Sequence, residues 1–160
     1  AIDMGGPINK AAYVTGTALL TSAGSAGSDV MAAVMIGGMV PPLAIAISAT
    51  INKNIWPKVQ RSGALVNYVM GLSFITEGAI PFAASNPARV IPPLFISSGI
   101  AGALSMTFGI VSKAPHGGIF AILASAVSNP LMYLLALVIG SVLGALMLIA
   151  SLSFGKKIEN

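Results

Sequence analysis

The sequence of 160 residues contains no cysteine and very few charged residues. The lack of cysteine excludes disulfides, thiolate metal sites and a cysteine nucleophile within this chain. Charged residues make up 8% of the chain, against about 25% in soluble domains, while 56% of the residues are hydrophobic. The composition therefore excludes an ordinary soluble domain and indicates a membrane protein.

Long apolar runs give a first picture of the fold. A membrane-spanning helix needs about 20 mostly apolar residues, and the ranges 30–51, 63–84, 90–112 and 129–154 each supply that length. We therefore expect an all-α, multi-pass transmembrane fold embedded in a lipid bilayer. The N-terminus shows no secretory signal peptide and no initiator Met, so we expect a fragment or processed product.

The positive charges lie at the ends of apolar runs. The net charge is +4, but lipid headgroups and the positive-inside bias explain it, so we expect no nucleic-acid partner. The loop that carries Lys53, Lys58 and Arg61 is predicted to be cytoplasmic, with Trp56 at the headgroup level. Arg89 is predicted to anchor the chain to headgroups or to dock a soluble partner.

The same bias places Lys156 and Lys157 in the cytoplasm, which requires an even number of crossings between the two basic clusters. The apolar runs give an odd number. Gly, Pro and polar residues interrupt the ranges 76–87 and 112–119, and two re-entrant hairpins there would restore the parity. The alternative is that the lysine pair departs from a statistical rule.

Glu77 and His116 are the candidate catalytic and substrate-binding residues. Glu77 is the only acid between Asp29 and Glu159, and His116 is the only histidine. An intramembrane carboxylate is costly unless it faces a partner or a cavity, and an imidazole can bond a hydroxyl or accept its proton. Structural roles remain open, with Glu77 bonded to backbone N–H groups or at the headgroup level, and His116 hydrogen-bonded in place.

The other candidate binding residues are uncharged or basic. Asn9 and Lys10 follow a flexible turn, although a helix start with a snorkelling lysine explains them equally well. Thr76 and Asn86 complete a mixed set of donors and acceptors. Cation sites gather several acids, so this set favours a neutral, hydroxyl-rich ligand and predicts no metal or other cofactor. The alternative is an ion-coupled secondary transporter in which Glu77 exchanges protons.

Four stretches in this order, GGPINKAAY, ITEGAIPFAASNPARVIP, GALSM and APHGGI, resemble the membrane-embedded C domain of the fructose permeases of the bacterial phosphoenolpyruvate-dependent phosphotransferase system. The chain resembles the C-terminal half of that domain over nearly its whole length. The resemblance implies a sugar-binding half with two re-entrant hairpins that moves in an elevator-like way. It also implies a missing N-terminal half that forms a homodimeric scaffold in the bacterial inner membrane.

The resemblance further implies the chemistry. Such permeases import fructose, or a related sugar, and release fructose 1-phosphate, so the chain would be part of a protein-phosphohistidine–sugar phosphotransferase complex. The phosphoryl donor is a phosphocysteine on a B domain, which fits the lack of cysteine here. The B domain would dock at the cytoplasmic face near Lys53, Lys58 and Arg61. Glu77 would contact sugar hydroxyls in the first hairpin, with His116 in the second hairpin region and Asn9 and Lys10 as neighbours.

Overall fold

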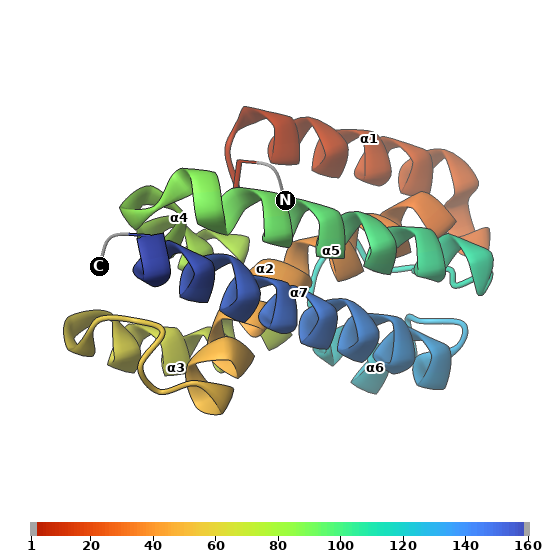
Figure 1. The fold of residues 1–160 in the computed structure, drawn as a ribbon. Coiled ribbons are helices and arrows are strands. Elements are labelled where there is room, and N and C mark those ends of the chain that lie inside the picture. The colour runs from red at the N-terminus through yellow and green to blue at the C-terminus, as the bar shows by residue number, and fades with distance from the viewer. Residues whose placement is uncertain (1–2, 159–160) are drawn as a thin grey trace.

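The computed structural model describes residues 3–158, with side chains described as far as Phe154. Every regular element in this part of the chain is helical, as the sequence predicts. Figure 1 shows α1 at one edge of the bundle and α3 and α6 at the opposite edge, with α5 and α7 between them. The elements are α1 (Pro7–Ala23), η1 (Gly24–Ala26), α2 (Asp29–Ile51), α3 (Lys58–Leu72), η2 (Thr76–Ala79), α4 (Ile80–Ser85), α5 (Pro87–Thr107), α6 (Phe120–Leu123) and α7 (Pro130–Ile158).

Three helices of the described chain are long and apolar enough to cross a membrane: α2, α5 and the Pro130–Phe154 part of α7. They agree within a few residues with the predicted spans 30–51, 90–112 and 129–154. The chain is therefore a multi-pass membrane protein. The side chains of Lys156 and Lys157, on which the parity argument depends, lie outside the described residues.

The fourth predicted span, 63–84, is wrong. The helix ends at Leu72, and Phe74 adopts a left-handed backbone conformation with φ of 62°. The short η2 and α4 then cover the rest of the apolar run. The hydropathy of the segment is high enough for a span, but the chain turns at residues 73–75, before TEGAIP, and Pro81 lies in the first turn of the separate helix α4. Helices also break over 108–119, so both predicted interruptions are present.

The central element is α2, which packs against α3, α5 and α7. Of its most apolar stretch, 72% of the residues are buried in the protein, against 39% for α5 and for α7. Of these three helices, α5 and α7 therefore leave more of their apolar surface for lipid than α2 does. Glycines allow the close approach: a Cβ on Gly140 would lie 2.5 Å from the Cβ of Ala101, and one on Gly144 would lie 2.6 Å from Ser97 Oγ.

The loop between α2 and α3 is anchored by its tryptophan. Trp56 is only 4% exposed, and its indole N–H donates to Ser48 Oγ at 3.0 Å. Its ring meets Phe82 edge to face, with centroids 5.0 Å apart. An indole that buries its ring and also satisfies its N–H is stable in a core, so Trp56 packs in the protein interior rather than against lipid headgroups.

Candidate functional site

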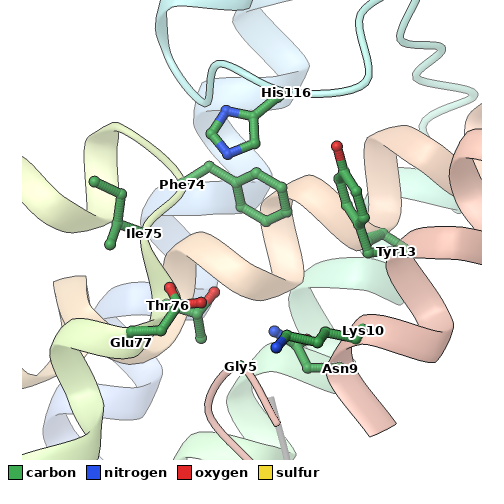
Figure 2. A pocket seen from close by; sticks show the side chains of 10 residues that line it. Gly5, Asn9, Lys10, Tyr13, Phe74, Ile75, Thr76, Glu77 and His116 are labelled. Carbon is green, nitrogen blue, oxygen red and sulfur yellow. The ribbon is translucent and has the colours of Figure 1, made fainter. Parts of the chain in front are cut away.

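A cavity of about 240 Å³ lies where three distant parts of the chain meet. The beginning of α1, the turn after α3 and the loop before α6 each contribute to its wall, and Val34 of α2 completes it. Figure 2 shows their side chains around a common space. The lining residues are Gly5, Asn9, Lys10, Tyr13, Val34, Phe74, Ile75, Thr76, Glu77 and His116.

An upstream carboxylate fixes the first wall. Asp3 accepts hydrogen bonds from the backbone N–H groups of Ile8 and Asn9, at 2.6 Å and 3.0 Å, and so caps the free N–H groups of α1. Proline at the first turn suits this start, because its fixed φ is already helical. The helix therefore begins at Pro7 and turns Asn9 and Lys10 toward the cavity (Figure 2).

The turn after α3 forms the second wall. The backbone N–H of Phe74 donates to the Gly71 carbonyl, and that of Ile75 donates to the Met70 carbonyl at 2.8 Å. The exposed Glu77 follows at once and lies against the N-terminal turn, since a Cβ on Gly5 would be 2.9 Å from Glu77 Oε1. Only glycine at position 5, with its φ of 104°, permits this approach.

The histidine loop is docked directly onto that turn. The backbone N–H of Ile119 donates to the Leu72 carbonyl at 2.9 Å. Gly118 packs so closely that a Cβ would overlap the Leu72 carbonyl oxygen. The His116 ring then lies 5.1 Å from the Phe74 ring, and the Tyr13 ring lies 6.3 Å from Phe74 on the other side. Figure 2 shows these three rings along one end of the cavity.

The cavity presents polar groups that are free to bind. Glu77, Lys10 and His116 line it, and no hydrogen bond or ion pair engages their side chains within the described residues. The wall thus offers carboxylate acceptors, ammonium donors and an imidazole that can do either. No cluster of three or more metal-ligating side chains is found among the described residues. The arrangement suits a small ligand with several hydroxyl groups.

Two other predicted binding residues, Thr76 and Asn86, do not offer free side chains to the cavity. Thr76 lines the cavity, but it is 3% exposed and its hydroxyl donates to the Gly38 carbonyl at 2.8 Å. Asn86 does not line this cavity and lies between α4 and α5, where its carbonyl accepts the N–H groups of Arg89 and Val90. The cavity therefore unites Glu77 and His116 with three of the four other predicted binding residues.

The predicted docking residues lie outside the cavity. Lys53 and Lys58 are exposed around the α2–α3 loop. Arg61 is half-buried and donates to Asn54 Oδ1 at 3.5 Å. Arg89 ties α5 to α7, because its guanidinium donates to the Ser151 carbonyl at 3.1 Å.

Sequence reasoning missed three residues that shape the site. Phe74 and Tyr13 supply its aromatic end, and Asp3 orients α1. An acid a few residues before a proline-initiated helix is a recognisable capping signal, so Asp3 could have been found. The two aromatic residues carry no local signal, because apolar rings at helical spacing are usually core.

Comparisons with known proteins support the family resemblance that the motifs indicate. No family model and no solved structure matches the chain. The chain is 51% identical over 151 residues to the fructose-specific EIIB'BC component of Rhodobacter capsulatus, covering 94% of the chain and 26% of the relative. It is 47% identical to the fructose-specific EIIABC component of Bacillus subtilis, covering 92% of the chain and 22% of the relative. The fructose permease IIC component of Bacillus amyloliquefaciens is also 47% identical, again over 92% of the chain.

The chain spans less than half the length of these relatives, 47% in the case of the Bacillus amyloliquefaciens permease. The similarity nevertheless runs through more than nine tenths of the chain. The resemblance predicted from those motifs is confirmed: the chain is homologous to the membrane component of fructose-specific phosphotransferase systems.

Proposed function

We propose that this chain is the sugar-binding part of a phosphotransferase-system permease that imports fructose, or a related sugar, and releases fructose 1-phosphate. One observation carries the proposal. Glu77, His116 and Lys10 come from three distant segments, yet their unbonded side chains line one cavity. The names of the relatives supply the sugar and the phosphotransferase system.

The size and chemistry of the cavity support a monosaccharide. Its volume of about 240 Å³ is below the range of about 300–1,000 Å³ that is usual for drug-sized ligands. A carboxylate accepts two hydroxyl hydrogen bonds at once, and the Lys10 ammonium and the Asn9 amide add donors. The rings of Phe74 and Tyr13 offer apolar faces to the C–H groups of a sugar.

Transfer of the phosphoryl group to the sugar needs a phosphoryl donor and a base that accepts the hydroxyl proton. The sugar hydroxyl oxygen forms a bond to phosphorus, the bond between the phosphoryl group and the cysteine sulfur of a B component breaks, and the hydroxyl proton passes to a base. Within the cavity Glu77 and His116 are the groups that could accept it. This chain has no cysteine, so its share of catalysis is positioning and proton acceptance.

The broken helices support a movable sugar-binding unit. We assign the re-entrant hairpins to α3–η2–α4 and to 108–129, because both contain short or interrupted helices that pack against other parts of the protein. Irregular backbone at membrane depth is stable only when protein or a watery cavity surrounds it. The chain, residues 1–160, would form the C-terminal transport half. The N-terminal half would supply a homodimeric scaffold against which it moves like an elevator.

The test is Glu77→Gln in the full-length permease, assayed in membrane vesicles with phosphorylated B component. We expect loss of both fructose uptake and fructose 1-phosphate formation, with normal membrane insertion, because the amide cannot accept the hydroxyl proton and replaces one acceptor oxygen with an NH2 donor. Asp29→Asn is the matched control, since Asp29 lies at the start of α2 and not in the cavity. Wild-type phosphorylation by Glu77→Gln would contradict the proposal. If the wild-type permease instead accumulated unphosphorylated sugar, it would be an ion-coupled transporter.

A further inference from the structure

The central helix α2 contains two adjacent prolines, Pro41 and Pro42. In an α-helix the carbonyl of one residue accepts the N–H of the residue four positions later. Pro42 has no N–H, so the carbonyl of Gly38 loses its partner within α2. Gly38 is buried, and a buried carbonyl without a partner is costly.

Thr76 supplies the missing donor. Its hydroxyl donates to the Gly38 carbonyl at 2.8 Å, across 38 residues of sequence. The contact needs a glycine, because a Cβ at position 38 would lie 3.0 Å from Thr76 Oγ1 and would overlap the Phe74 ring. The turn that carries Phe74 and Glu77 is thus fixed to the opening that Pro42 makes in α2.

The same device occurs a second time in the chain. Pro93 of α5 cannot donate to the Arg89 carbonyl, and Ser151 Oγ of α7 donates to that carbonyl at 2.9 Å. Arg89, Pro93 and Ser151 do not line the cavity. A hydroxyl that satisfies a proline-freed carbonyl is therefore a way of joining helices in this protein, and only one of the two joints reaches the site.

We propose that Thr76 is a positioning residue for Glu77, acting through the Gly38 carbonyl that Pro42 sets free. The inference deepens the proposed function and rests on it. The Thr76 hydroxyl already donates its hydrogen to the Gly38 carbonyl, and the side chain is buried. Thr76 therefore contributes to sugar binding by holding the neighbouring Glu77 carboxylate in place. Thr76 is the residue directly before Glu77, and a shift of one moves the other.

The experiment measures the Kd for fructose and the Tm of the purified full-length permease. Thr76→Val keeps the shape but removes the donor, and we expect Kd to rise about tenfold with a lower Tm. Thr76→Ser restores the hydroxyl and should bind as the wild type does. Ser151→Ala, which breaks the matched joint, should lower Tm and leave Kd unchanged.

A double variant separates positioning from stability. In Thr76→Val with Pro42→Ala the new N–H satisfies the Gly38 carbonyl within α2, so Tm should recover while Kd stays raised. Recovery of both, or wild-type binding by Thr76→Val, would overturn the inference. Glu77→Gln is measured in parallel. If Glu77→Gln loses fructose binding while Thr76→Val binds normally, only the role of Thr76 is contradicted. If Glu77→Gln binds fructose normally, the sugar site itself is contradicted.

Discussion

Gly118 holds the histidine loop on the turn that carries Glu77, and Gly118→Ala tests that contact. The residue has φ of 55°, in the left-handed region. A Cβ there would overlap the Leu72 carbonyl oxygen and lie 2.9 Å from the Phe74 backbone nitrogen. These atoms are backbone and cannot swing away, so the loop itself must move.

The cost follows from two terms. Left-handed backbone costs a residue other than glycine about 1–2 kcal/mol. Displacement of the loop also removes the hydrogen bond from Ile119 to Leu72, worth about 1 kcal/mol net. Gly118→Ala should therefore destabilise the protein by about 2–3 kcal/mol. Gly109 has a nearly equal φ of 61° but nothing within 4 Å of its Cβ position, so Gly109→Ala should cost only the first term, about 1–2 kcal/mol.

Thermal unfolding in detergent and calorimetric titration with fructose read out the two effects. Gly118→Ala should show the lower Tm of the pair and a weakened affinity, because His116 leaves the cavity. Gly109→Ala should lower Tm slightly and bind normally. The reasoning is refuted by equal Tm losses in the two variants together with an unchanged Kd in Gly118→Ala.

Two further predictions concern the start of α1 and the basic loop. Asp3→Ala removes the cap of α1, which should cost about 0.5–2 kcal/mol and speed amide hydrogen exchange at Ile8 and Asn9, whereas Asp3→Asn should retain most of the protection; unchanged exchange in Asp3→Ala would contradict the capping role. Lys53→Glu combined with Lys58→Glu should raise the KM for phosphorylated B component, most strongly at low salt, and leave the Kd for fructose unchanged; an unaltered KM would exclude this loop as the docking surface.

The sequence was sufficient to single out polar residues that share one cavity. In a chain with 8% charge, each isolated polar residue within an apolar context is expensive, which singles out Glu77. His116 and the Asn9–Lys10 pair could be selected in the same way, from their turn-rich surroundings. These residues lie around one cavity, although nothing in their spacing gives the distances between them.

Other features depend on contacts that hydropathy does not encode. The run 63–84 is apolar enough to span a membrane, but it bends at Phe74 because other segments pack around the turn. The partner of Thr76 could not be predicted either. The sequence shows that Pro42 cannot donate to the Gly38 carbonyl, but only the fold determines which hydroxyl bonds to that carbonyl instead.

The enclosure of α2 changes how its sequence should be interpreted. A hydropathy scale would score the replacement of Gly38 by leucine as an improvement in a spanning helix, yet the space beside Gly38 is already filled by the Phe74 ring and the Thr76 hydroxyl. Steric volume, rather than affinity for lipid, therefore limits which side chains this helix can accept. Variants that look harmless by polarity should be the most damaging along α2, and the lipid-facing surfaces of α5 and α7 should tolerate them.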